Sequence, residues 1–213
     1  MEWYVYVAIA FVVVAFVVGK ILSHVRAKKQ KTSEQEHRSS GELGEDAVQN
    51  VIGDTVEGEQ YVLNNLFLGT DAHSAEIDHV VINPRGVFVI ETKNLSGDIY
   101  GTEHDAEWTQ VLAGGDLKHT HRNPIKQNAV HARRVKELVG NVRIFPLVVM
   151  VQNNTRRIEA SNVIGLRHLR AVLERGEDVL SPMQMAEAYY ILKENSLDIT
   201  ADEHIRNCER DHN

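Results

Sequence analysis

The stretch IDHVVINPRGVFVIETK, residues 77–93, decides the fold of this chain. Two apolar runs flank the turn signal Asn-Pro-Arg-Gly, which predicts a β-hairpin. Side chains alternate between the faces of a strand, so Glu91 and Lys93 point to the same face. Pairing the strands symmetrically about Pro84-Arg85 places Asp78 opposite Glu91, which sets like charges against each other. A glycine bulge after a type I turn is the alternative, because it would shift the register by one residue and turn Asp78 to the other face.

The charged residues at the ends of this hairpin predict a site that cleaves phosphodiester bonds. A divalent cation between Asp78 and Glu91 would offset their repulsion, and Lys93 would add positive charge beside it. Magnesium is held by one or two carboxylates together with water and substrate phosphate oxygens. It polarises the phosphate and lowers the pKa of an attacking water. Taken alone, the three residues also fit a cross-strand salt bridge at a sheet edge.

Two further groups of residues are candidates for the same site. Glu45 lies in a predicted helix at residues 42–52, off the apolar stripe that includes Leu43, and Glu42 is an equally good carboxylate on spacing alone. The second group lies on a helix predicted from Asn123-Pro124 to about residue 139, where Pro124 suits the first turn. Its members are Gln127, His131 and Arg134, which share one face, with Lys126 and Arg133 beside them. Alternatively, these residues form only the polar, solvent-exposed side of an amphipathic helix.

The charge distribution is uneven. The formal net charge is −7, and residues 1–40 carry six Lys or Arg against three Glu, which leaves about −10 on residues 41–213. Such an acidic domain argues against tight, nonspecific binding of nucleic acid. Residues 118–143 are a local exception, with seven Lys or Arg against the single acid Glu137, and they predict a surface that contacts phosphates.

The predicted elements define an α/β fold. Their order is helix, three strands, helix, strand, which predicts a mixed sheet flanked by helices. The strands are expected at residues 61–68, 76–82, 87–93 and 145–151. Residues 97–101 fit a short strand or a turn, and residues 102–122 have no regular pattern.

The two ends of the chain differ from this core. Residues 1–22 form an apolar run, uncharged from Trp3 to Gly19 and followed by cations, which predicts a transmembrane helix with the N-terminus outside and the body in the cytoplasm. Residues 23–40 are a polar linker, and residues 41–152 are the predicted catalytic domain. Residues 153–213 are expected to form a helical extension, in which Ser181-Pro182 begins a helix and residues 200–210 form a weaker one.

Several classes of protein are excluded by absent motifs. The single cysteine, Cys208, excludes a disulfide framework within one chain and a multi-cysteine zinc site. The chain has no GxxxxGK[ST] motif and no GxSxG motif, which argues against P-loop nucleotidases and serine hydrolases of the α/β type.

Together these motifs resemble a known family. They are GELGE on the first helix, IDHVV, GVFVIETKN, a downstream Trp and NPIKQN, in that order from about Gly41 to Val151. This pattern is similar to the nuclease-related domain, which is placed in the PD-(D/E)xK restriction-endonuclease-like superfamily. The superfamily pattern has proline before the first Asp, where this chain has Ile77, as is usual in the nuclease-related domain.

The resemblance implies roles for residues of this chain. Glu45, Asp78 and Glu91 would hold magnesium or manganese, Lys93 would be catalytic beside Asp78 and Glu91, and Gln127 would assist. The implied function is a membrane-anchored, metal-dependent nuclease that acts on DNA, with Lys126, His131, Arg133 and Arg134 in contact with the nucleic acid.

Two alternatives remain open at the level of sequence. The first is a membrane-tethered module that binds nucleic acid, or has a regulatory role, without cleaving it. The second is a membrane scaffold whose C-terminal helices bind a protein partner.

Overall fold

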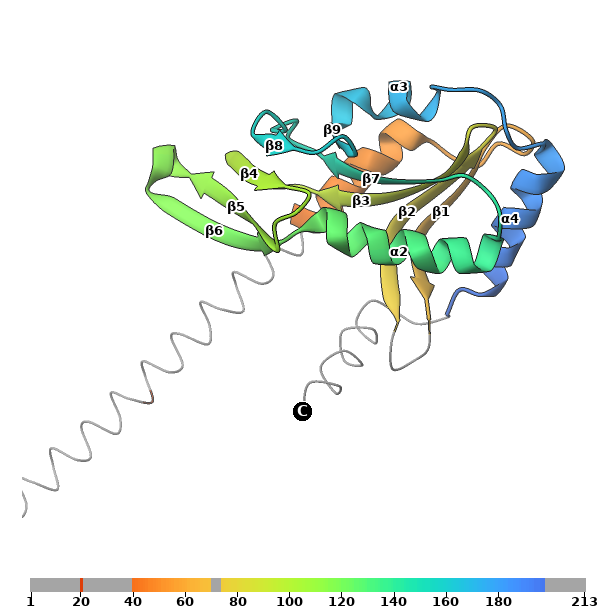
Figure 1. Cartoon of the computed structure of the whole chain (residues 1–213), viewed down its shortest axis with the longest axis horizontal. Helices are drawn as coiled ribbons and strands as arrows, with labels where there is room; N and C mark the ends of the chain where they lie inside the picture. Colours follow the sequence, from red (N-terminus) through yellow and green to blue (C-terminus); the bar gives the residue numbers. More distant parts are fainter. Residues whose placement is uncertain (1–19, 21–39, 70–73, 198–213) are drawn as a thin grey trace, which may run out of the picture. The chain divides into compact units, whose positions relative to one another are not determined.

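The computed structural model describes Lys20 and residues 40–69 and 74–197 (Figure 1). The chain divides into two compact units, Met1–Glu42 and Leu43–Asn213, and the second unit is described here. The predicted membrane segment, nearly all of the linker and the predicted helix at residues 200–210 lie outside the described residues. None of the helices in the described ranges has the length and apolar character that a membrane span requires.

A five-stranded mixed sheet forms the centre of the unit. Its order is β1-β2-β3-β7-β9, with antiparallel pairing among the first three strands and parallel pairing from β3 to β9. The predicted mixed sheet is therefore confirmed. The strands are β1 (Tyr61–Leu68), β2 (Ala75–Asn83), β3 (Gly86–Lys93), β7 (Ile144–Met150) and β9 (Val163–Gly165).

The hairpin of β2 and β3 has the symmetric register. Asn83 pairs with Gly86 and His79 with Ile90, so the turn consists of Pro84 and Arg85 alone. The bulged alternative is wrong for this turn, and continuing the same register by one residue sets Asp78 across from Glu91. Gly86 fits this turn because its φ is 144° and a Cβ there would lie 2.7 Å from the Arg143 carbonyl oxygen.

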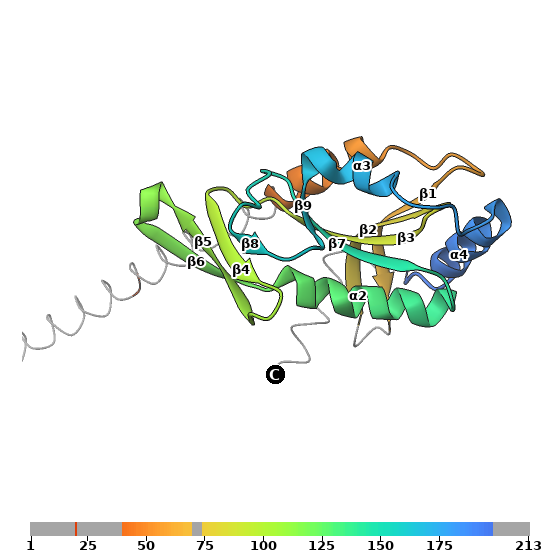
Figure 2. The same cartoon turned by 45° about the horizontal axis from the view of Figure 1, so that its top comes forward.

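Helices cover both faces of the main sheet (Figures 1 and 2). On one face, α2 (Pro124–Val139) and α4 (Pro182–Glu194) pack against apolar side chains that include Val80 and Val89. On the other face, the first helix (residues 40–52, of which 43–52 belong to this unit) and α3 (Leu169–Leu173) pack against side chains that include Val81 and Ile90. Leu43 is 65% exposed, so its predicted place on the apolar stripe is wrong, whereas Val48 of the same helix is fully buried.

A second, four-stranded sheet corrects the prediction for residues 97–122. Three strands form an antiparallel meander between β3 and α2, where the sequence indicated only a short strand and irregular chain: β4 (Asp98–Thr102), β5 (Glu107–Leu112) and β6 (Leu117–Arg122). The order in this sheet is β6-β5-β4-β8, with β8 (Ile158–Glu159) parallel to β4. Trp108 is 1% exposed and packs with Ile99 against side chains of β7 and β9, so the meander has an apolar base.

The segment after β7 is not purely helical. It supplies β8 to the second sheet and β9 to the main sheet before α3 and α4 follow. Ser181 begins α4 as predicted, because its side chain accepts a hydrogen bond from the Gln184 N–H while the Gln184 side chain accepts one from the Ser181 N–H. The predicted extension of residues 153–213 thus contributes to both sheets as well as to the helical layers.

Candidate active site

The site lies where β2 and β3 carry their charged residues. Glu91 is 1% exposed, and its Oε1 accepts a hydrogen bond of 2.6 Å from Lys93 Nζ, whose side chain is 27% exposed. Asp78 is half-buried, and its Oδ2 accepts a hydrogen bond of 2.6 Å from the Thr92 main-chain N–H. Because Glu91 and Lys93 are two positions apart on one strand, the hairpin itself brings these charges together.

The charges in this cluster act strongly on one another. Burial raises the pKa of the Asp78 carboxyl well above its usual value, and the charges of Glu91 and Glu45 raise it further, against the opposing effects of the Thr92 N–H and Lys93. Burial disfavours the Lys93 ammonium, but Glu91, Asp78 and Glu45 outweigh this and raise the pKa of Lys93. The cluster therefore holds more negative than positive charge, which is the condition under which a cation binds.

Glu45 joins the cluster from the first helix. Gly44 is buried, and a Cβ at this position would lie 2.7 Å from Cβ of Asn94. This close approach brings the helix against the end of β3, and the charge of Glu45 consequently acts on both Asp78 and Lys93. The structure thus brings Asp78, Glu91 and Lys93 together, and the charge of Glu45 acts on this group from the first helix.

Two asparagines fix α2 beside the site. The Asn128 side chain is fully buried, and its Nδ2 donates to the carbonyl oxygens of Val89 at 2.9 Å and Leu147 at 2.8 Å. Asn123 is the N-cap of α2, where its Oδ1 accepts from the Ile125 N–H at 2.9 Å. The helix is therefore bonded to both β3 and β7, and its side chains have fixed positions relative to Glu91.

His131 is the α2 residue that approaches the cluster. It is 6% exposed, and its Nδ1 lies 3.5 Å from Oε2 of Glu91. Burial lowers the pKa of His131, with contributions from Arg134 and Lys93, against the opposing effect of Glu91. The expectation that His131 contacts nucleic acid on the surface is corrected by this burial, because the side chain turns towards the carboxylates.

The other predicted residues of α2 lie further out. Gln127 and Arg133 are exposed. Arg134 is half-buried and donates from Nη1 to the Leu68 carbonyl oxygen at 2.8 Å, and exposed Lys126 donates from Nζ to the His104 carbonyl oxygen at 2.8 Å. Gln127 precedes His131 by one helical turn and so shares its side of the helix.

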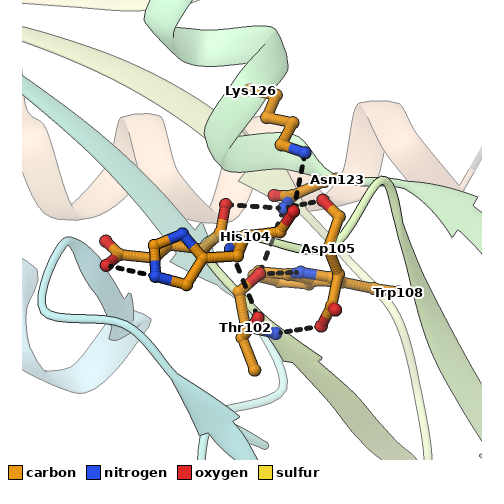
Figure 3. Close-up of polar contacts among 7 residues, drawn as sticks. Thr102, His104, Asp105, Trp108, Asn123 and Lys126 are labelled. Atoms are coloured by element: carbon orange, nitrogen blue, oxygen red, sulfur yellow. Dashed lines mark hydrogen bonds and ion pairs between the residues drawn. The ribbon is translucent and has the colours of Figure 1, made fainter.

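The chain between β4 and β5 is bonded to the start of α2 (Figure 3). Asn123 Nδ2 donates to the carbonyl oxygens of Thr102, Glu103 and Asp105, and Lys126 reaches the same loop (Figure 3). Thr102 also accepts from the Trp108 indole N–H at 3.0 Å. The Asn-Pro start of α2 thus connects the meander, through hydrogen bonds, to the helix that carries His131.

Sequence reasoning missed the structural roles of Asn123 and Asn128. Both lie in the NPIKQN motif, in which functional roles were predicted only for Lys126 and Gln127. A signal was available, because Asn before Pro at a helix start predicts an N-cap. The Asn128 side chain gives no such local signal, since its partners Val89 and Leu147 are distant in sequence.

The donor set fits a hard divalent cation. Glu91 Oε1 is engaged by Lys93, whereas Oε2 is buried and makes no hydrogen bond, so at least one lone pair of Oε2 is left for a ligand. Asp78 supplies a second carboxylate beside it, which meets the need of magnesium for one or two such groups. Within the described ranges, no three His, Cys, Asp or Glu side chains are grouped as ligands of a metal ion.

Comparison with known proteins gives two curated relatives. An uncharacterized protein of Bacillus anthracis is 38% identical over 100 residues, which cover 46% of each chain. A probable kinase, PglW, of Streptomyces coelicolor is 32% identical over 77 residues, 36% of this chain and 5% of the kinase. The chain thus spans less than half the length of either relative, and no solved structure matches it.

A family model covers the part of the chain that holds the site. The model of the nuclease-related domain matches residues 40–151, just over half of the sequence. The matched range begins at the helix of Glu45, contains Asp78, Glu91 and Lys93, and ends directly after β7. This chain therefore belongs to the nuclease-related domain family, NERD.

Proposed function

We propose that this chain is a membrane-anchored, metal-dependent nuclease that hydrolyses phosphodiester bonds in DNA. The observation that carries the proposal is the cluster of half-buried Asp78, buried Glu91 and Lys93 at the end of the β2–β3 hairpin. A cluster that raises the pKa of one of its own carboxyls costs folding energy, and a bound cation relieves this cost. The family supports nuclease chemistry in preference to an unrelated metal site.

Each residue has a stated role in this proposal. Asp78 and Glu91 hold magnesium or manganese, and Glu45 adds negative charge at the same place. When bound, the cation polarises the scissile phosphate and supplies an attacking water of lowered pKa. Lys93 stays protonated, because its pKa is raised, and it offsets the charge that develops on the phosphate. Gln127, which is exposed one helical turn before His131, would orient the substrate phosphate or the attacking water.

The basic residues of α2 supply the contacts to the nucleic-acid backbone. Exposed Arg133 and Lys126 are free to approach phosphates from solvent, although Lys126 must share its ammonium with the His104 carbonyl. Arg134 contributes from a half-buried position. The net negative charge of the whole chain limits nonspecific affinity, so productive binding depends on the cation and on these few side chains.

The membrane anchor rests on the sequence alone. The uncharged run from Trp3 to Gly19 is followed by five Lys or Arg within about 12 residues, an asymmetry that keeps the following domain in the cytoplasm.

The test is a cleavage assay on the full chain, kept in mild detergent. Single-stranded DNA, duplex DNA and RNA are each incubated with magnesium, manganese or EDTA. Cleavage is expected with either cation and not with EDTA, and it is lost in Asp78→Asn and Glu91→Gln. The matched control is Asp46→Asn, which removes an exposed carboxylate next to Glu45 and keeps activity.

Either alternative outcome is informative. If folded protein cleaves none of the substrates, the nuclease proposal fails, and a non-catalytic module that binds nucleic acid takes its place. If RNA alone is cut, the chemistry stands and the substrate assignment to DNA is wrong.

A further inference from the structure

The two oxygens of Glu91 have different surroundings. Oε1 accepts the hydrogen bond from Lys93 Nζ at 2.6 Å. Oε2 is buried and has no hydrogen-bond partner, and the same is true of His131 Nδ1. These two atoms lie 3.5 Å apart. Two buried polar atoms that face each other at this distance are each costly to leave without a partner. A shift of a few tenths of an ångström would bring them within hydrogen-bonding range.

The scaffold leaves His131 little freedom to point elsewhere. Its helix is bonded to the Val89 and Leu147 carbonyls through Asn128, three residues earlier in the chain. Ala132 and Val135, on the same helix, are buried in the apolar cluster of that sheet face. The imidazole is thus held at a fixed height above β3, opposite Glu91.

We propose that His131 is a positioning residue for Glu91: Nδ1–H holds Oε2 in the orientation that binds the divalent cation. This inference rests on the proposed function, because it assigns a role toward the cation of that site. With Lys93 on one oxygen and His131 beside the other, the carboxylate plane is fixed from two sides. An imidazole can donate through Nδ1 whether it is neutral or protonated.

The role is distinct from that of a ligand or of a surface contact. Hydrogen-bonding partners of a metal ligand fix its rotamer, and their loss typically lowers metal affinity by about 10- to 100-fold. His131 contributes nothing to phosphate binding in this arrangement, since it is 6% exposed.

Substitutions at His131 separate hydrogen bonding from packing. The amide nitrogen of Asn is attached to Cγ, as Nδ1 is, so His131→Asn keeps a donor near the native position. His131→Leu keeps a similar volume without a donor, and His131→Gln moves the amide to the position of Nε2. His119→Leu removes an exposed histidine of β6 and is the matched control.

The experiment measures manganese binding to the full chain in detergent by isothermal titration calorimetry, with thermal melting in EDTA as the test of folding. His131→Leu is expected to lower manganese affinity by about 10-fold or more, whereas His131→Asn and His119→Leu stay within roughly threefold of the wild type. If His131→Leu does not melt cooperatively, the manganese affinities of His131→Asn and His131→Gln are compared instead, and His131→Asn is expected to bind manganese more tightly.

The outcomes separate this inference from the proposed function. Unchanged affinity in His131→Leu, or equal losses in Leu and Asn, overturns the positioning role and leaves the nuclease proposal standing. If His131→Leu fails to fold, equal manganese affinities of His131→Asn and His131→Gln also overturn the positioning role. A wild-type chain that binds no manganese overturns both.

Discussion

The carboxylate cluster predicts that Asp78→Asn stabilises the fold while it removes activity. Asn keeps the shape of the side chain and an oxygen that can accept from the Thr92 N–H, the hydrogen bond of 2.6 Å in the wild type. It removes the negative charge that is buried near Glu91 and Glu45. We expect the free energy of unfolding at pH 7, without a cation, to rise by about 0.5–2 kcal/mol, the range typical of a substitution that relieves an unfavourable charge.

The pH dependence has a definite sign. The pKa of Asp78 is higher in the folded chain than its usual 3.8, so the folded state binds the proton more tightly than the unfolded state. Stability of the wild type therefore falls as pH rises from the usual pKa through the folded one. The advantage of Asp78→Asn is largest at neutral pH and disappears below the usual pKa, where both side chains are neutral.

A bound cation reverses the comparison. Magnesium at about ten times its dissociation constant would stabilise the wild type by roughly 1.4 kcal/mol and leave Asp78→Asn largely unchanged. Urea denaturation of both proteins, across pH and with magnesium or EDTA, measures these terms, with Asp46→Asn as the control for charge removal at an exposed position. The reasoning is refuted if Asp78→Asn is less stable than the wild type at pH 7 in EDTA, or if its gain does not change with pH.

Three further predictions concern the scaffold and the basic surface. Asn128→Ala removes two hydrogen bonds to buried strands and should lower the free energy of unfolding by about 2 kcal/mol, measured by urea denaturation. A loss below about 0.5 kcal/mol, roughly half the value of one hydrogen bond, would contradict the anchoring role of Asn128. Gly101→Ala should cost about 1–3 kcal/mol in the same measurement, because a Cβ there overlaps the Trp108 ring, and an unchanged midpoint would show that the meander can shift. Arg133→Ala should weaken DNA binding by similar factors across sequences and lower the slope of log affinity against log salt by about 1, measured by fluorescence anisotropy with the inactive Asp78→Asn chain as background. An unchanged slope would remove Arg133 from the contact surface.

The hairpin and its charges could be predicted from the sequence because they depend on local rules. A two-residue turn fixes the register, and strand alternation then fixes which face each charge takes. Glu91 and Lys93 accordingly form the predicted pair, with their atoms 2.6 Å apart. The place of Glu45 needed the resemblance, since helix spacing alone did not separate it from Glu42.

The meander could not be predicted because its strands have little apolar alternation. β6 is an edge strand of its sheet, five of its six residues are exposed, and most of its side chains are charged or polar. Gly114 and Gly115 lie in the turn between β5 and β6. The apolar base of this sheet depends on Ile99 and Trp108, whose partners lie in β7 and β9, far along the chain.

The error at His131 has a different cause. Periodicity correctly placed it on the side of α2 that carries Gln127, but periodicity gives direction around a helix and not depth below the surface. The polar end of the sheet, with Glu91, lies beneath that turn of the helix, so a polar residue is buried there. Burial of this kind follows from tertiary packing, which the helix pattern does not encode.

The topology of the main sheet has a consequence for the order of folding. Asp78 and Glu91 meet through a two-residue turn, a contact of low sequence separation that closes quickly. Val87 pairs with Ile144, and the meander and α2 lie between these two residues in the sequence. Closing this longer loop costs more conformational entropy than closing the β2–β3 hairpin. The repelling carboxylates are therefore local partners in the growing chain, while His131 reaches Glu91 through a contact that is distant in sequence. Assembly of this chain thus brings its least compatible charges together by a local step that precedes closure of the parallel half of the sheet.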